Sequence, residues 1–303
     1  MEAQRVAVPV LARPRGLAAG VRAVRRKAFR FITRQPTGTA GLLMVVVIFV
    51  MAFFAPWLER YDPLWQDYKE ARIAPGLTHF MGTDEYGRDL WARVVGGARL
   101  ALMVGVVSVL TGSLFGLFAG IVSGYVGGGT DNIIQRLTEV MLAFPSLLLA
   151  LAVMATLGSG VDKVIIAISI SFIPRTVRVM RGTTLSIKEN VYIDAVRTIG
   201  ASPMRIMVRH VLPNVMAPYL IIASSLLGTA ILTEATLSFL GLGIPPPHPS
   251  WGRMLSQSVA MYAVSAPWMV IFPGLAITWL VLGFNLFGDT LRDIWDPRLR
   301  GRS

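Results

Sequence analysis

Cysteine is absent from this 303-residue chain, and histidine occurs only as His79, His210 and His248. The chain therefore has no thiol to serve as a nucleophile or as a soft metal ligand. The motifs H-E-x-x-H and G-x-S-x-G are also absent. An intramembrane hydrolase would need Asp, Ser or His groups that converge inside apolar spans, and the sequence offers few of them. We therefore expect neither an enzyme nor a metal site.

A phosphate-binding loop is missing as well. The glycine-rich turn at residues 124–129 does not lead into Gly-Lys-Ser or Gly-Lys-Thr. The chain thus lacks the cradle of backbone amides and lysine that usually holds ATP. We expect it to bind no cofactor of its own.

Charged residues are scarce, at 15% of the chain, whereas hydrophobic residues make up 54% and the mean hydropathy is +0.60. Soluble domains carry about 25% charged residues, so this composition indicates a membrane protein. A helix needs about 20 apolar residues to cross a bilayer. Charge-free runs of at least this length occur at 37–58, 100–130, 140–161, 211–233 and 254–288.

A sixth span is expected at 163–181, although its charge-free core is short. Arg175, Arg178 and Arg181 follow that core, and long basic side chains at a helix end can reach the membrane interface. We therefore predict an all-α integral membrane protein with six transmembrane helices.

Basic residues give the chain a net charge of +12, which by itself could suggest a nucleic-acid partner. Their distribution indicates membrane orientation instead: nine Lys or Arg lie in residues 1–37, seven lie in 175–209 and four follow Gly288. Six spans place these three segments on one side, which the positive-inside rule makes cytoplasmic. Both termini are then cytoplasmic, the lipid bilayer is a partner, and nucleic acid is not.

The loop at 59–97 is the one sizeable extracytoplasmic segment. From Glu59 to Arg99 the chain holds seven acids and six Lys or Arg, with Asp84, Arg88 and Arg93 among them. Such a mixture of opposite charges predicts a small, salt-bridged cap at the start of the second span, and direct contact with the substrate is the alternative role.

The second span, near 100–122, carries Gly112, Gly116 and Gly120 at intervals of four residues. Small residues at this spacing let two helices approach closely in lipid, where packing drives helix association. We expect close helix packing along this stripe.

A polar segment at 189–214 predicts two short amphipathic helices joined at a glycine turn. Gly200 occupies the position where a helix commonly ends in a left-handed residue. Ser202 and Pro203 are typical of the start of the next helix, and Pro213 is expected to end that helix near Leu212. The apolar stripe of the second helix would be Met204, Met207, Val208 and Val211.

This segment could simply tie two spans together, and a helix-turn-helix DNA reader is a further structural possibility. Membrane-length runs flank it closely and it has no separate soluble core, which argues against DNA binding.

The same segment resembles the cytoplasmic signature loop of bacterial ABC importer permeases, E-A-A-x3-G-x9-I-x-L-P. The full spacing of this motif is kept in Asp194-Ala195-Val196, Gly200 and His210-Val211-Leu212-Pro213. Three positions differ: Asp194 replaces Glu, Val196 replaces Ala and His210 replaces Ile. Further stretches resemble the dipeptide, oligopeptide and nickel branch of that family. They are residues 82–89, 238–243, 245–252 and 285–297.

The resemblance implies a type I ABC importer permease fold and a permease subunit that translocates peptides or similar small solutes across the bacterial inner membrane. It also implies a second permease subunit, an extracytoplasmic solute-binding protein and two ATPase subunits that carry ATP and magnesium. The residues expected to couple to the ATPase lie in the signature loop. They are Asp194, Ala195, Val196, Gly200, Ser202, Pro203, Arg205, Arg209, His210, Leu212 and Pro213.

Three ionisable residues within predicted spans are candidates to line the transport pathway, because such groups usually face protein or water. Arg136 and Glu139 lie three residues apart and can pair along one helix face, whereas Glu234 lies near the outer end of the fifth span. After that span, the proline-rich stretch at 245–249 rules out a continuous helix. We expect a re-entrant or capping loop there, with Trp251 at the membrane interface.

The predicted organisation comprises a basic tail (1–37), a first span (38–58), the outer loop (59–97), a transmembrane domain (98–288) and a cytoplasmic tail (289–303). Within the transmembrane domain we expect spans near 100–122, 134–157, 163–183, 215–237 and 268–288. The coupling loop at 189–213 also lies in this domain. A self-sufficient secondary transporter or channel is the alternative function. It would be expected to show several ionisable positions within spans and internal repeats, and the sequence has few of the former and no clear repeat.

Overall fold

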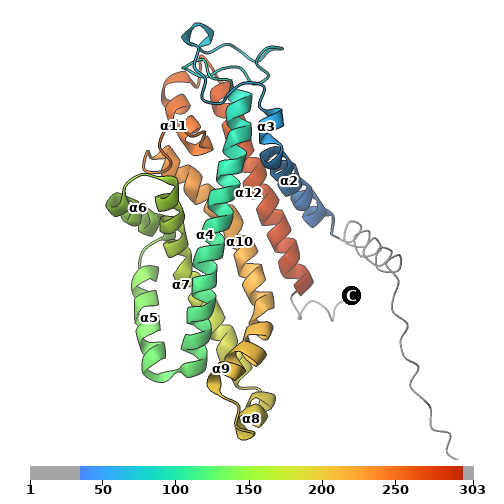
Figure 1. Cartoon of the computed structure of the whole chain (residues 1–303), viewed down its shortest axis with the longest axis vertical. Helices are drawn as coiled ribbons and strands as arrows, with labels where there is room; N and C mark the ends of the chain where they lie inside the picture. The colour runs from blue at the N-terminus through green and yellow to red at the C-terminus, as the bar shows by residue number, and fades with distance from the viewer. Residues whose placement is uncertain (1–34, 296–303) are drawn as a thin grey trace, which may run out of the picture.

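The computed structural model describes residues 35–295, and its helices form an elongated bundle with no strand in that range (Figure 1). The predicted all-α class is confirmed. Most of the basic tail at 1–37 and the last residues of the 289–303 tail lie outside the described residues.

The bundle is built around α4 (Leu90–Val126), which runs most of its length (Figure 1). Its main neighbours are α7 (Val161–Lys188) and α10 (Leu212–Phe239). On the other side, α2 (Pro36–Phe53) packs against both α4 and α12 (Trp268–Trp295). The apolar core correspondingly forms two clusters, one around α4, α7 and α10 and one around α2, α11 and α12.

Four stretches of helix in the described range are long and apolar enough to cross a membrane: α2, α4, the stretch 203–239 that includes α10, and α12. A bent pair, α5 (Gly128–Leu142) and α6 (Ser146–Leu157), would make a fifth if it counts as one span. Helix α7 is long enough, but its second half is rich in arginine. The sixth crossing therefore stays a prediction.

The span predicted near 134–157 is not one continuous helix. Helices α5 and α6 meet at an angle of 91°. Pro145 stands immediately before α6 with an extended ψ of 137°. A proline ring cannot continue the preceding helix, and it disfavours helical conformation in the residue before it, so the chain turns at this point.

The glycine stripe of α4 packs against α7 as expected. A Cβ atom added to Gly116 would lie 2.6 Å from Cβ of Thr176, and one added to Gly120 would lie 2.6 Å from Cβ of Met180. Gly112 likewise faces the backbone of Ser169. The two helices approach so closely that no side chain larger than hydrogen fits between them.

Helix α4 begins at Leu90, eight residues before the predicted domain boundary at 98. The reason is local: the carboxylate of Asp89 accepts a hydrogen bond from Ala92 N at 2.8 Å and caps the helix. The segment before it contains α3 (Ala55–Leu58), η1 (Tyr68–Glu70) and otherwise irregular backbone. We call residues 59–89 the outer cap.

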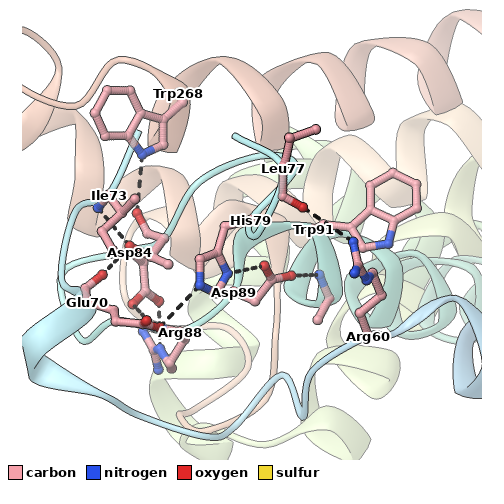
Figure 2. Close-up of polar contacts among 12 residues, drawn as sticks. Arg60, Glu70, Ile73, Leu77, His79, Asp84, Arg88, Asp89, Trp91 and Trp268 are labelled. Atoms are coloured by element: carbon pink, nitrogen blue, oxygen red, sulfur yellow. Dashed lines mark hydrogen bonds and ion pairs between the residues drawn. The ribbon is translucent and has the colours of Figure 1, made fainter. Parts of the chain in front are cut away.

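Ion pairs hold the outer cap together, as predicted (Figure 2). Asp84 accepts from Arg88 Nε at 2.6 Å and also from the backbone amide of Arg88. His79 is buried and lies between Asp89 Oδ2, 2.7 Å from its Nδ1, and Glu70 Oε2, 3.2 Å from its Nε2. The cap is thus fixed to the first turn of α4.

Helix α10 ends at a turn through Gly241, whose φ is 85°, and α11 (Trp251–Tyr262) follows the proline-rich stretch. The expectation that Trp251 lies at the membrane interface is wrong. Its side chain is only 1% exposed, and its Nε1 donates to the carbonyl of Val94 at 2.9 Å. Ser250 caps α11 and turns its first residue inward against α4.

Candidate functional site

The polar segment at 189–213 lies at the end of the bundle opposite the outer cap (Figure 1). It contains α8 (Val191–Thr198) and α9 (Pro203–Ile206). Gly200 has a φ of 82°, as predicted. The amide of Gly200 donates to Arg197 O at 2.9 Å and that of Ala201 to Val196 O at 3.3 Å. This pair of bonds is the Schellman arrangement, which ends a helix at a left-handed residue.

The second helix starts where the sequence predicts. Ser202 Oγ accepts from the amide of Arg205 at 3.4 Å, and Pro203 occupies the first helical position. The first amides of a helix have no acceptor inside the helix. Ser202 supplies an acceptor for one of them, and Pro203 has no amide hydrogen that would need one.

The prediction that Pro213 ends this helix is wrong. A π-helical segment, η2 (Met207–Val211), joins α9 directly to α10, so that helix runs from Pro203 to Phe239. The amide of Leu212 bonds to Met207 O, five residues back. This wider turn changes the pattern of backbone hydrogen bonds in the helix just before Pro213, which has no amide hydrogen to donate.

The π segment also changes which residues face the bundle. The buried positions are Ile206, Val211 and Val215, whereas two members of the predicted stripe, Met204 and Val208, are 66% and 50% exposed. Buried residues are therefore five apart across the π turn and four apart beyond it. A stripe drawn at the α-helical period misses this shift.

Apolar side chains are exposed at the tip of the segment. Val191 is 84% and Ile199 82% exposed, and with Met204 and Val208 they form a set that we call the apolar tip. Val191 and Ile199 lie outside the membrane-length helices, and Met204 and Val208 lie in the first two turns of the helix 203–239. Exposed large apolar residues of this kind indicate a protein contact surface.

Charged residues surround the apolar tip. Asp194 Oδ1 accepts from Arg197 at 3.1 Å. Arg205 and Arg209 are exposed and have no ion-pair partner among the described residues. Of the other predicted coupling residues, Ala195, Ser202, Pro203 and Pro213 are exposed, and Val196, His210 and Leu212 are half-buried.

Contacts between residues far apart in the sequence hold this segment against the bundle. Lys188 Nζ donates to the carbonyl of Tyr125, at the end of α4, at 2.8 Å. The guanidinium of Arg197 lies 5.5 Å from the centre of the Tyr125 ring. Ile193 is fully buried in the core cluster of α4, α7 and α10. No local sequence pattern links Tyr125 to this segment, so these contacts could not be predicted from spacing.

The three candidate pathway residues lie at two separate places, Arg136 and Glu139 on α5 and Glu234 on α10. Arg136 and Glu139 form the predicted pair on α5, at 3.3 Å, and both are largely exposed. Glu139 also lines a polar pocket of about 530 Å³ together with Asp131 and Arg181, which pair with each other at 2.6 Å. Glu234 is buried near the far end of α10, where its Oε1 accepts from Ser238 at 2.8 Å and from Ser250 at 2.9 Å.

Metal ligands do not converge anywhere in the described part of the chain. Within residues 35–295, no three His, Asp or Glu side chains gather closely enough to hold a metal ion.

Comparisons with known proteins agree on one family. Residues 112–301 match the family described as "binding-protein-dependent transport system inner membrane component", and residues 25–75 match the "N-terminal TM domain of oligopeptide transport permease C".

Two relatives resemble the chain over nearly its whole length. A putative peptide transport system permease protein of Brucella suis biovar 1 is 41% identical over 92% of this chain and 90% of the relative. The glutathione transport system permease protein GsiD of Escherichia coli O157:H7 is 42% identical over 90% of each chain. Among solved structures, the MetNI methionine ABC transporter in an inward-facing conformation has the same fold. It matches with a TM-score of 0.56 at 19% identity, covering 68% of this chain and 97% of that one.

Proposed function

Because the chain belongs to the family of binding-protein-dependent transport system inner membrane components, we propose that residues 189–213 receive the motion of an ATPase subunit. The chain is the permease subunit of an ABC importer, and ATP hydrolysis takes place in partner subunits. It is a multi-pass protein of the inner membrane. A self-sufficient secondary transporter does not fit this family.

The apolar tip is the observation that carries the proposal. Val191 and Ile199 are more than four-fifths exposed although they lie on a well-anchored helical unit. Burial of such side chains in a cleft of the ATPase subunit would remove apolar surface from water. Asp194, Arg205 and Arg209 would orient the docked partner by charge.

Continuity between the docking segment and a membrane helix supports transmission of motion. The helix from Pro203 to Phe239 has no non-helical break. Ile206 and Val211 anchor its lower end in the core. A displacement at the apolar tip would therefore move α10 as a rigid body and alternate access to the pathway.

The names of the relatives suggest what is transported. We propose peptides, glutathione or similar small solutes as substrates, delivered by an extracytoplasmic binding protein. A second permease subunit and two ATPase subunits would complete the assembly, with both termini cytoplasmic. Arg136 and Glu139 remain candidates to line the pathway, because they are exposed beside a polar pocket. The contacts of Glu234 favour a supporting role.

Gly200→Val tests the docking proposal. No atom lies within 4 Å of a Cβ added at Gly200, so the substitution strains the backbone at positive φ without a steric clash. That strain costs about 1–2 kcal/mol, more for a β-branched residue. We expect the variant to insert normally, to co-purify less of the ATPase subunits and to lose ATPase activity stimulated by the binding protein.

Gly182→Ala is the matched control. Gly182 also has open space around its Cβ position, but it lies within α7 at an ordinary helical φ. This variant should retain normal association and activity. Wild-type ATPase binding and transport by the Gly200→Val protein would contradict the assignment.

A further inference from the structure

A pocket of about 300 Å³ lies between the outer cap and the start of α11. The outer cap and α11 lie toward the opposite end of the bundle from residues 189–213 (Figure 1). The polar lining of the pocket comes from three separate segments. Its polar side chains include those of Tyr68, Tyr86, Arg88, Arg93, Arg253 and Gln257.

Two arginines in this pocket lack partners for a buried nitrogen. The Nε atoms of Arg93 and Arg253 are both buried and have no hydrogen-bond acceptor within the described part of the chain. Arg93 is only 2% exposed; its Nη1 donates to Pro63 O at 3.0 Å, and its Nε lies 3.5 Å from Asp84 Oδ2. Because both Nε atoms are buried, a ligand in the pocket would contact only the terminal guanidinium nitrogens, and those of Arg253 have no acceptor within the described part of the chain.

Arg88 is already engaged. Its Nε donates to Asp84 at 2.6 Å, and its guanidinium lies 4.5 Å from the centre of the Tyr86 ring. Arg253, in contrast, forms no ion pair with any described residue. Arg253 is therefore the arginine of this pocket whose donors are unused by any described residue, whereas Arg93 already donates to Pro63 O and lies beside Asp84.

The charge balance indicates the class of ligand. Three arginines line the pocket, and two neighbouring carboxylates, Asp84 and Glu85, pair with Arg88 and Arg93. These five groups together carry one net positive charge. A single carboxylate neutralises that charge, whereas a phosphate dianion would exceed it. Guanidinium groups bind carboxylates with two parallel hydrogen bonds.

We infer that this pocket binds the carboxylate group of a small organic solute, with Arg253 as the principal donor and Arg93 behind it. The volume is at the lower end of the range for ligand sites, which suits the carboxylate end of a solute. Gln257 and the Tyr86 hydroxyl would contact the neutral atoms beside it. This binding does not depend on ATPase docking at residues 189–213, so either proposal can fail without the other.

The test is a calorimetric titration of the full chain, co-purified with its partner subunits in lipid nanodiscs. The probes are N-acetyl-L-alanine and its primary amide, which have nearly the same size but differ in the carboxylate. We expect saturable binding of the acid and at least about 10-fold weaker binding of the amide. Arg253→Gln should weaken binding of the acid by about 10-fold or more.

Two further variants make the result specific. Arg60→Gln removes the same charge from an exposed position of the outer cap that does not line the pocket, and it should bind as wild type. Gln257→Glu places a carboxylate in the pocket and should abolish binding, which decides the matter if Arg253→Gln does not fold. Equal affinity for acid and amide, no saturable binding, or wild-type binding by both pocket variants would overturn the proposal. If the pocket instead receives an acidic side chain of a docked protein, the titration should show no saturable binding of the free acid.

Discussion

Glu234 shows how a single buried carboxylate can join two helices. It is 2% exposed, and its Oε1 accepts hydrogen bonds from Ser238, one turn further along α10, and from Ser250, which caps α11. A buried acceptor with two donors avoids much of the cost of removing it from water. The residue therefore fixes the turn between α10 and α11.

Substitutions at Glu234 should show whether the residue stabilises the fold or takes part in transport. Glu234→Ala leaves two buried hydroxyls without an acceptor and should lower the free energy of unfolding by about 1–3 kcal/mol. Glu234→Gln keeps a carbonyl oxygen and should lose less stability and retain uptake. Thermal unfolding in detergent and uptake in vesicles measure the two effects. Loss of uptake by a stable Gln variant would instead place the charge of Glu234 in the pathway.

At the scale of elements, the contact between α4 and α7 depends on the absence of side chains. Gly116→Ala would place a methyl group 2.6 Å from Cβ of Thr176. Overpacking of this kind costs about 1–3 kcal/mol. We expect a lower unfolding temperature for Gly116→Ala than for Gly182→Ala, in which the added methyl meets open space. Equal stability of the two variants would show that the helices separate at little cost.

The sequence predicted the features that depend on nearby residues. The glycine stripe, the turn at Gly200 and the start at Ser202 and Pro203 each follow from local spacing, and the structure confirms all three. The salt-bridged outer cap was predictable for the same reason.

Features that depend on distant contacts could not be predicted in this way. Pro213 usually ends a helix, but a π turn in the preceding residues accommodates it. Trp251 is typical of a membrane interface, yet the close approach of α11 to α4 buries it. The Tyr125 contacts and the pocket around Arg253 join segments far apart in the chain. The bend at Pro145 is the exception, because the proline itself is a local signal for it.

The outer cap and residues 189–213 lie at opposite ends of the bundle (Figure 1). The absence of cysteine makes their placement easy to test. Leu77 is 91% exposed in the cap, and Ile199 is 82% exposed at the apolar tip. In intact spheroplasts, a membrane-impermeant maleimide should label Leu77→Cys and leave Ile199→Cys unlabelled until the membrane is permeabilised. Labelling of Ile199→Cys in intact spheroplasts would reverse the proposed orientation.

Helix α4 has a mechanical consequence for such an assembly. Its 37 residues span roughly 55 Å at about 1.5 Å per residue, well beyond the thickness of the hydrocarbon layer. Asp89 fixes one end to the outer cap, and Tyr125 contacts Lys188 and Arg197 at the other. In such an assembly the helix would act as a lever that extends beyond both faces of the membrane, and a small tilt at one end would displace the other by several ångströms.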